Sequence, residues 1–375
     1  MKLILLFIFS CGLTLVYSNC ERDREIICYW GSWSIYRREI GFFNVSNINT
    51  DICTTIVYAF AGLDLNLDLA SIDSNADITR GGFAEFVKLK QKEPCLKTMV
   101  AVGGWNEGTR KFSVASSTTE SRKNLAQSIL KFLVYYGFDG IDIDWEYPTS
   151  EGGLPEDGSN FVELLNEIKT AISPWGLKLS IAVSFDNSLI GTGYNIIGIN
   201  KSVDFVNLMA YDYISSNSNY TGLSAPLSKI NETVTKWLNG GLSSKKLALG
   251  IPAYCKNFVL KDPQKNGIGA EVKAIGLPGD FTQQEGLLAY YEVLQIESIR
   301  KTAVNMVDGT IYGYHDDEWM TYDNEETVSG KVKYAISQNL GGIMFWSLEL
   351  DDFNGEFGDP YPLLNAVHKE FKDFV

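Results

Sequence analysis

Histidine is rare in this 375-residue chain, and basic residues are fewer than acidic ones. It has two histidines, His315 and His368, so it offers no evident histidine metal site. Its 32 lysines and arginines are outnumbered by 46 aspartates and glutamates, which gives a formal net charge of −14. An acidic surface argues against nucleic acids and anionic membranes as partners, and it is compatible with a neutral polysaccharide.

Repeats and low-complexity segments are also missing, which excludes solenoids, propellers and long disordered tails. The single long apolar run lies near the N-terminus, from Leu3 to about Val16, after Met1-Lys2 and before Tyr17-Ser18. This pattern is typical of a secretory signal peptide. A membrane anchor is the alternative, but the run is short for a span of about 20 residues. We therefore expect residues 1–18 to be removed and residues 19–375 to be secreted.

Cysteine is sparse. Cys11 lies in the expected signal peptide, so its removal leaves an odd number of cysteines. A secreted protein can form disulfides, but at least one thiol must then stay unpaired within the chain. The five that remain are Cys20, Cys28, Cys53, Cys95 and Cys255. Four sequons for N-glycosylation, at Asn44, Asn200, Asn219 and Asn231, fit secretion.

The most distinctive stretch runs from Phe138 to Pro148 and holds four acids within eight residues. Successive side chains on a strand point to opposite faces, so three of the acids share one face and three apolar residues share the other. A plain core strand would not have this composition, because like charges repel and aspartate is a poor strand former. We interpret it as a barrel strand that ends in an active site, in preference to a solvated acidic edge.

The three acids on one face are Asp142, Asp144 and Glu146. Residues two apart on a strand lie roughly 6–7 Å from each other, so these carboxyls can share protons. Burial and mutual repulsion raise the pKa of at least one of them. We expect Glu146, at the strand end, to stay protonated and the other two to support it. Asp139 is out of phase with them and is expected to be structural.

Seven further apolar runs lack clean alternation, as expected for strands that are buried on both faces of a parallel sheet. They cover 26–30, 54–63, 97–104, 177–183, 203–211, 246–254 and 341–348. Residues 121–136 and 161–172 have helical spacing, and Gly137 is a plausible helix stop. With the acid-bearing run, this order predicts an α/β fold, a (β/α)8 TIM barrel.

The seventh and eighth runs are too far apart for a single connecting helix. Short strand-like pieces and turn residues fill about 257–316, so we predict an inserted α+β subdomain that forms one wall of a cleft. No separate carbohydrate-binding module is visible in the sequence.

Active sites of such barrels lie at the carboxyl ends of the strands. Aromatic rings stack on the apolar faces of sugars, while acids and tyrosines bind the hydroxyls, so the residues expected there predict a sugar-binding cleft. Besides the acids and Tyr211, they are Tyr29, Trp33, Phe60, Gly104, Trp105, Asn106, Tyr147, Met209, Asp212, Tyr254 and Trp346.

The pattern Asp-x-x-Asp-x-Asp-x-Glu, from Asp139 to Glu146, resembles the signature of the glycoside hydrolase family 18 chitinases. Residues 58–62, 103–106, 209–212 and 341–346 also resemble family segments, in the right order. The resemblance extends from Cys28 to about Phe353. It implies the barrel with its inserted subdomain, a Cys28–Cys53 disulfide, no cofactor, and a monomer that binds chitin or its oligosaccharides.

The resemblance also implies roles for the site residues. Glu146 would be the general acid, and Asp144 would orient the substrate's own N-acetyl group, whose carbonyl attacks the anomeric carbon. Asp142 would share a proton with Asp144. Tyr211 would hydrogen-bond the acetamido carbonyl, Asp212 and Tyr147 would hold the sugar, and Trp346 would form the floor beneath it.

Two segments depart from the family pattern. After Tyr254 the family usually has Gly-Arg-Ser, where this chain has Cys255-Lys256-Asn257. Lysine keeps the charge but loses the bidentate fork of arginine, which puts sugar contacts here in doubt. Residues 214–217 replace a His-Gly-Ser-Trp segment, which removes a stacking platform on the leaving-group side. We expect Cys255 to be a buried apolar residue, and the family's C-terminal disulfide has no cysteines here.

Three functions are compatible with these motifs. The first is a secreted chitinase that cleaves β-1,4-linked N-acetylglucosamine polymers with retention, acting within chains. The second is a chitinase-like lectin that binds chitin oligosaccharides without cutting them. The third is an endo-β-N-acetylglucosaminidase that acts on glycoproteins. Family lectins usually replace the glutamate or a supporting aspartate, whereas this chain keeps Glu146, Asp144, Asp142 and Tyr211, which favours the enzyme.

Overall fold

A computed structural model describes residue 20, residues 23–300 and residues 302–372. The expected signal peptide, residues 1–18, lies outside the described residues. No helix in the described part of the chain is long and apolar enough to span a bilayer.

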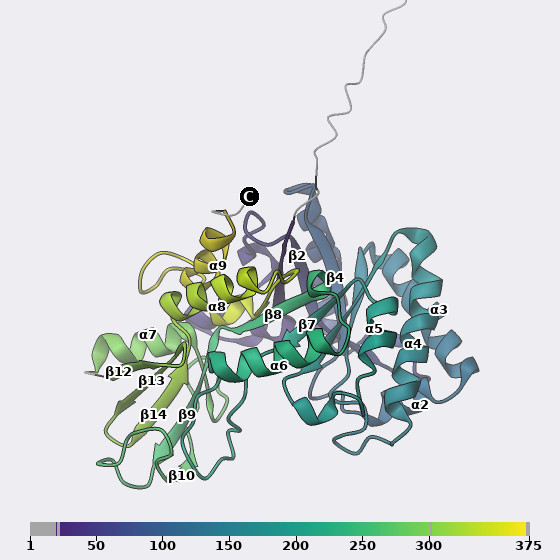
Figure 1. Ribbon diagram of the computed structural model, residues 1–375. Helices are drawn as coiled ribbons and strands as arrows, with labels where there is room; N and C mark the ends of the chain where they lie inside the picture. Colours follow the sequence, from purple (N-terminus) through teal and green to yellow (C-terminus); the bar gives the residue numbers. More distant parts are fainter. Residues whose placement is uncertain (1–19, 21–22, 301, 373–375) are drawn as a thin grey trace, which may run out of the picture.

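Eight parallel strands form a closed barrel, which confirms the predicted fold class (Figure 1). In space they follow the order β1-β15-β8-β7-β6-β5-β4-β2, and the pairing of β1 with β2 closes the ring. The strands are β1 Glu25–Gly31, β2 Thr55–Leu63, β4 Lys97–Gly103, β5 Gly140–Asp144, β6 Lys178–Ser184, β7 Phe205–Met209, β8 Leu247–Pro252 and β15 Gly342–Trp346. Each matches one of the apolar runs found in the sequence. β3, Leu69–Ser71, pairs antiparallel with the end of β2.

Helices cover the outside of the barrel: α1 Gly82–Val87, α2 Arg110–Ser116, α3 Thr119–Tyr136, α4 Asp157–Ile172, α5 Ile196–Ser202, α6 Leu227–Asn239, α8 Glu325–Ser337 and α9 Pro362–Lys372. The predicted helix at 121–136 begins two residues earlier, because Thr118 and Ser121 form a capping box. It ends at Gly137, which has a φ of 84°. The helix predicted at 161–172 begins at Asp157, since its first turn is polar and shows no apolar periodicity.

Short helical turns complete the barrel. They are η1 Ser32–Tyr36, η2 Glu39–Gly41, η3 Val45–Asn47, η4 Asn75–Thr79, η5 Lys88–Gln91, η6 Ser173–Trp175, η7 Asn187–Leu189, η8 Ser244–Lys246 and η9 Leu348–Leu350. Only η1 to η3 connect β1 with β2, so no α-helix covers the barrel between these two strands.

A second, antiparallel sheet lies between β8 and β15 in the sequence, on the opposite side of the barrel from α2, α3 and α4 (Figure 1). Its strands are β9 Tyr254–Leu260, β10 Val272–Ile275, β11 Leu287–Ala289, β12 Ala303–Val307, β13 Thr310–His315 and β14 Glu318–Tyr322, and α7 is Tyr290–Ile299. The sheet therefore extends beyond the expected 257–316 at both ends. Tyr254 was expected at the end of a barrel strand, but it begins β9, because β8 ends at Pro252.

The two faces of β5 differ as its alternating sequence predicts. Ile141, Ile143 and Trp145 are at most 1% exposed, and the Trp145 ring stacks on Phe112 of α2 at 5.5 Å. The apolar face thus packs against the outer helices, and the acids face the barrel interior. Asp139 pairs with Lys90 at 2.8 Å, in keeping with a structural role.

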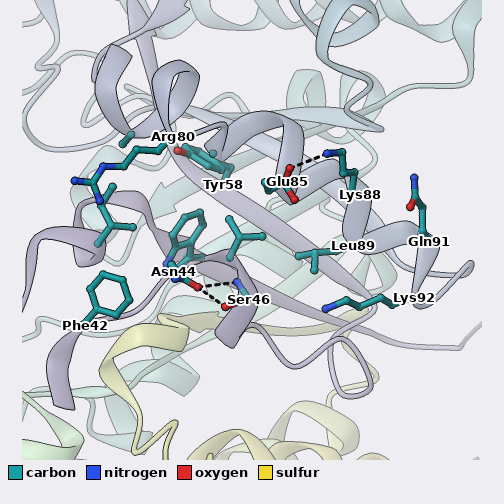
Figure 2. Close-up of a pocket in the computed structure, with 15 residues that line it drawn as sticks. Phe42, Asn44, Ser46, Tyr58, Arg80, Glu85, Lys88, Leu89, Gln91 and Lys92 are labelled. Carbon is teal, nitrogen blue, oxygen red and sulfur yellow. Dashed lines mark hydrogen bonds and ion pairs between the residues drawn. The ribbon is translucent and has the colours of Figure 1, made fainter. Parts of the chain in front are cut away.

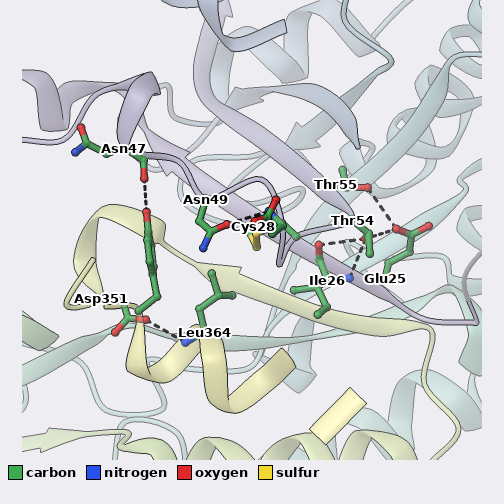
Figure 3. Close-up of a disulfide and its surroundings, with 12 residues drawn as sticks. Glu25, Ile26, Cys28, Asn47, Asn49, Thr54, Thr55, Asp351 and Leu364 are labelled. Atoms are coloured by element: carbon green, nitrogen blue, oxygen red, sulfur yellow. Dashed lines mark hydrogen bonds between the residues drawn. A yellow bond between two sulfur atoms is a disulfide. The ribbon is translucent and has the colours of Figure 1, made fainter. Parts of the chain in front are cut away.

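Two disulfides connect the early part of the chain. Cys28, in the middle of β1, is bonded to Cys53, two residues before β2 (Figure 3), which is the bridge that the family resemblance implies. Cys20 and Cys95 form a second bridge, a pairing that the sequence left open. Cys255 is free and fully buried, as expected of an apolar residue.

Candidate active site

The acid series lies at the carboxyl end of β5, inside the barrel. Asp142 is 0% exposed and Asp144 is 3% exposed. Glu146 lies two residues beyond the strand's end and is partly exposed. The strand expected to carry all three acids is therefore shorter than predicted, which leaves the outermost acid on the loop that faces the cleft.

Three strands hold Asp142 in place. Its carboxylate accepts hydrogen bonds from Tyr29 Oη at 2.8 Å, Ser180 Oγ at 2.5 Å and Asn207 Nδ2 at 3.1 Å. These partners come from β1, β6 and β7. Burial raises the pKa of Asp142, and the three hydrogen bonds oppose that shift. Asp142 is thus a rigid, fully coordinated group at the base of the site.

Asp144 lacks such support. Its Oδ1 is buried and has no hydrogen-bond partner among the described residues. Burial raises the pKa of Asp144 well above its ordinary value, and the charges of Glu146 and Asp142 raise it further. This oxygen is free to bond a ligand. When Asp144 is protonated it can donate a hydrogen bond, and when Asp144 is ionised it can accept one.

Glu146 has a pKa raised to about 7. Burial is the main cause, and the charge of Asp212 adds to it, while hydrogen bonds from Tyr147 and from the Trp105 backbone oppose it. A carboxyl group with such a pKa can give up a proton and take it back near neutral pH, which is what a general acid must do. At neutral pH such a group is about half protonated, so the expectation that Glu146 stays protonated remains a prediction.

Two glycines bring the end of β4 against β5. The Gly104 amide donates to the Asp144 carbonyl oxygen at 2.9 Å. Gly103 has a φ of 117°, and a Cβ there would lie 2.1 Å from the same carbonyl oxygen. Only glycine fits this position, so the close approach of the two strands depends on it.

Tyr211 lies immediately after β7 and is 6% exposed. Burial raises its pKa strongly, and the charge of Asp144 is the next largest cause, ahead of Asp212 and Glu146. Its hydroxyl has one contact, with Met344 Sδ at 3.8 Å, which is weak. Because this bond to sulfur is weak, the hydroxyl remains available to donate to a ligand, and its pKa responds to the charges of the acids. Met209, the last residue of β7, is partly exposed.

Asp212 links the barrel to the second sheet. It has a φ of 63°, and its carboxylate accepts from Tyr254 Oη at 2.6 Å and pairs with Lys256 Nζ at 2.9 Å. Lys256 also donates to Ser216 Oγ at 3.3 Å, and its side chain is 13% exposed. The ammonium group of Lys256 is therefore bound by Asp212 and Ser216 of the protein itself, which argues against a contact between this lysine and a sugar.

Aromatic side chains line one side of the site. The rings of Trp33 and Phe60 stack at 6.1 Å with an angle of 13°, and Phe60 lies 5.8 Å from Trp346. Trp33 is 41% exposed, while Trp105 is 63% exposed and follows β4 together with exposed Asn106. Flat, accessible rings next to carboxyls suit the stacking of pyranose rings.

Two of the expected binding residues, Tyr29 and Tyr254, are buried next to the acidic side chains of the site. Tyr29 is 1% exposed, and its hydroxyl is taken by Asp142 and by Asn207 Nδ2 at 2.7 Å, so it supports the acid from beneath. Tyr254 is 5% exposed and holds Asp212. Both hydroxyls thus hold carboxylates of the site, and contacts of these two residues with a sugar stay a prediction. Tyr147 remains at the site and hydrogen-bonds Glu146.

Sequence analysis missed Ser180 and Asn207. Both carry a polar side chain in the middle of an otherwise apolar strand, in Leu-Ser-Ile and Val-Asn-Leu. A buried polar group must find a partner, so this interruption was a usable signal. The identity of that partner depends on the closed barrel, which no local pattern reveals.

No group of three or more histidine, cysteine, aspartate or glutamate side chains is placed to hold a metal ion within residues 23–300 and 302–372. A separate hollow of about 680 Å³ lies on the outer side of β1 and β2 (Figure 2). Asp142, Asp144 and Glu146 do not line it.

Comparison with known proteins gives consistent matches. The profile of the family described as glycosyl hydrolases family 18 matches residues 25–351. Mouse chitotriosidase-1 is 35% identical over 379 residues, which cover 96% of this chain and 80% of the mouse protein.

Solved structures agree with the sequence comparison. The group IV chitinase of Ostrinia furnacalis in complex with allosamidin is 35% identical with a TM-score of 0.91, covering 94% of this chain and 99% of that one. Human YKL-39, described as a pseudo-chitinase with retained chitooligosaccharide binding, is 29% identical with a TM-score of 0.86, covering 93% and 100%.

Proposed function

The chain belongs to glycosyl hydrolase family 18, and from that premise we propose that it is a secreted chitinase that hydrolyses β-1,4-linked N-acetylglucosamine polymers within the chain. One observation supports this proposal above all: the chain retains Asp142, Asp144 and Glu146 at the carboxyl end of β5, and the charges of all three act on the pKa of Tyr211.

The proposed chemistry uses the substrate's own acetamido group as the nucleophile. Glu146 donates its proton to the glycosidic oxygen as the bond to the leaving sugar breaks. The acetamido carbonyl oxygen attacks the anomeric carbon from the opposite face and forms a cyclic intermediate. Asp144 accepts a hydrogen bond from the acetamido N–H, and Tyr211 donates one to its carbonyl oxygen.

Water completes the reaction in the proposed second step. The Glu146 carboxylate takes a proton from water as the water oxygen bonds to the anomeric carbon and the ring of the intermediate opens. The sugar product keeps its β configuration, and Glu146 returns to its protonated state. No second carboxylate nucleophile is needed, which fits an acid series confined to one strand and its following loop.

A chitin-binding lectin is the second candidate. The observation that favours it is the arrangement around Lys256, whose charge is taken by Asp212 and Ser216, while residues 214–217 present no aromatic platform for the leaving-group sugars. Weak binding on that side would slow cleavage but leave binding on the aromatic side intact. Both candidates take the same ligand and differ only in turnover.

Substitution of Glu146 tests the proposal. We expect Glu146→Gln to abolish release of product from a fluorogenic N-acetylglucosamine oligomer, because an amide cannot protonate the leaving oxygen. Oligosaccharide binding, measured by calorimetry, should stay close to wild type. The matched control is Glu163→Gln on the exposed face of α4, which should keep full activity. Unchanged turnover in the Glu146 variant would refute the assignment.

Secretion as a monomer is part of the same proposal. Two disulfides, Cys20–Cys95 and Cys28–Cys53, support passage through an oxidising compartment. N-terminal sequencing of the protein from a eukaryotic culture medium should find the first residue at about position 19. Light scattering should give the mass of one chain.

A further inference from the structure

The hollow outside β1 and β2 exists because only short turns connect these strands (Figure 2). Its volume is about 680 Å³. Residues 42–46 form one wall, and α1 with η5 forms the other. Buried Trp30 and Tyr58 form the floor, and the polar side chains of Arg80, Gln91 and Lys92 lie at the rim. The site thus has an apolar base and a polar edge.

Asn44 lines this hollow and is the first residue of the sequon Asn44-Val45-Ser46. Its Oδ1 accepts from the Ser46 amide at 2.9 Å and from Ser46 Oγ at 2.6 Å. These two bonds fix which end of the amide is oxygen. The amide nitrogen Nδ2, to which an N-linked sugar attaches, is therefore not the atom that contacts Ser46.

Phe42 lies two residues before Asn44, on the same wall of the hollow. Its side chain is 38% exposed, so the ring is accessible from the hollow. An aromatic ring packs well against the apolar face of a sugar ring. Phe42 and Asn44 line the same hollow, so the accessible ring is available to contact a sugar that enters it.

The other three sequons lack this setting. Asn200 Oδ1 accepts from the Ser243 amide at 3.0 Å, and Asn231 Oδ1 accepts from Tyr334 Oη at 3.0 Å. Asn219 is exposed, and none of the three lines the hollow. Of the four sequon asparagines, Asn44 is the one that lines this hollow.

We infer that Asn44 carries an N-linked glycan whose first N-acetylglucosamine lies in this hollow against Phe42. The Asn44 nitrogen loses one proton and bonds to C1 of the sugar, which leaves the lipid pyrophosphate of an oligosaccharide donor. The next sugars reach the polar rim, where Arg80 and Gln91 offer donors to their hydroxyls. The glycan takes the place of the missing helix and stabilises the β1–β2 connection. The inference rests on the proposed secretion.

The test uses the full chain secreted from cells that make only high-mannose glycans. Peptide mass spectrometry gives the occupancy of each sequon. Endoglycosidase H leaves the first N-acetylglucosamine in place, whereas peptide N-glycosidase removes it and converts the asparagine to aspartate. We expect Asn44 to be occupied. Trimming to one sugar should keep the unfolding midpoint, and complete removal should lower it by about 1–3 °C.

Matched variants separate the effect of losing the contact with the sugar from the effect that each substitution has on the protein alone. Phe42→Ala should lower the midpoint more in the protein that carries the sugar than in the fully deglycosylated protein, because only the former also loses the contact with the sugar. Ser46→Thr should keep occupancy at Asn44, and Ser46→Ala should lose it.

Three results would overturn the inference. The first is an unmodified Asn44 while Asn219 or Asn231 is occupied, which would leave secretion intact. The second is a midpoint that does not change when the first sugar is removed. The third is a non-covalent ligand in the hollow, seen by native mass spectrometry. If no sequon is modified and the protein stays inside the cell, the proposed secretion fails as well.

Discussion

Asp142, Asp144 and Glu146 have the same functional group in three environments. Asp142 is saturated by three hydrogen bonds, Asp144 has a buried oxygen without a partner, and Glu146 reaches the open side of the site. Environments that push the pKa values of neighbouring acids apart assign them different tasks. The outermost acid is the one able to meet a glycosidic oxygen, because it alone is partly exposed.

The pH dependence of activity follows from the Glu146 pKa of about 7. The general acid must be protonated, so kcat/KM should fall as pH rises through that value. The charge of Asp212 helps to raise this pKa, so Asp212→Asn should move the falling limb to lower pH. The measurement is a pH profile with a fluorogenic oligomer. Asp51→Asn, at an exposed position, serves as control, and an unchanged or upward-shifted limb in Asp212→Asn would contradict the account.

Strand alternation predicted the acids and their common face, because that pattern is local. It could not place Tyr29, whose hydroxyl meets Asp142 across 113 residues of sequence. Ser180 and Asn207 reach the same carboxylate from two other strands. Such contacts are fixed by closure of the barrel, and the sequence shows only that each polar residue needs a partner.

A buried ion pair ties the second sheet to α8. Lys331 Nζ lies 2.5 Å from both carboxylate oxygens of Asp323, and both side chains are 0% exposed. Burial lowers the pKa of Lys331 and raises that of Asp323, while their mutual attraction opposes both shifts. Asp323 follows β14, so the pair fixes the point where the chain leaves the second sheet and begins α8.

Removal of one partner should leave an uncompensated buried charge. We expect Lys331→Met to destabilise the protein by about 3–5 kcal/mol, measured by denaturant unfolding. The double variant Asp323→Leu/Lys331→Met should recover much of that loss, since replacing both partners leaves no charge in the core. A single variant as stable as wild type, or a double variant less stable than the single, would show that the pair has no such role.

The eight barrel strands could be predicted because a strand that is buried on both faces appears in the sequence as an apolar run. The change of sheet after β8 was not, because the sequence from Leu247 to Tyr254 is one continuous apolar run. Pro252 ends β8 inside that run, and Tyr254 already pairs with Ala289 of the second sheet. A switch between two sheets leaves the composition unchanged, so only the pairing partners reveal it.

The acid cluster should lower the stability of the whole molecule at neutral pH. The folded-state pKa of Glu146, about 7, exceeds the unfolded value of about 4.3, so the folded state binds more protons between these values. Stability therefore falls as pH rises through that window. This is the opposite of a salt-bridged carboxylate, which stabilises the protein above its unfolded pKa.

Glu146→Gln should therefore be more stable than wild type above pH 7. A shift of this size corresponds to at most about 4 kcal/mol, and the real effect is smaller because Glu146 is partly exposed to solvent. Near pH 4 the two proteins should unfold alike. Thermal and denaturant unfolding at both pH values give the comparison, with Glu163→Gln as control. Equal stability of the Glu146 variant and wild type at pH 8 would show that the surroundings do not raise the pKa of Glu146.

The central claim is that the acid series turns over a chitin chain. The most direct measurement is incubation of the wild-type protein with an N-acetylglucosamine hexamer, with products sized by mass spectrometry and their anomers followed by NMR. We predict dimers, trimers and tetramers that appear first as the β anomer. An intact hexamer that is nevertheless bound, or products that appear first as the α anomer, would contradict the account.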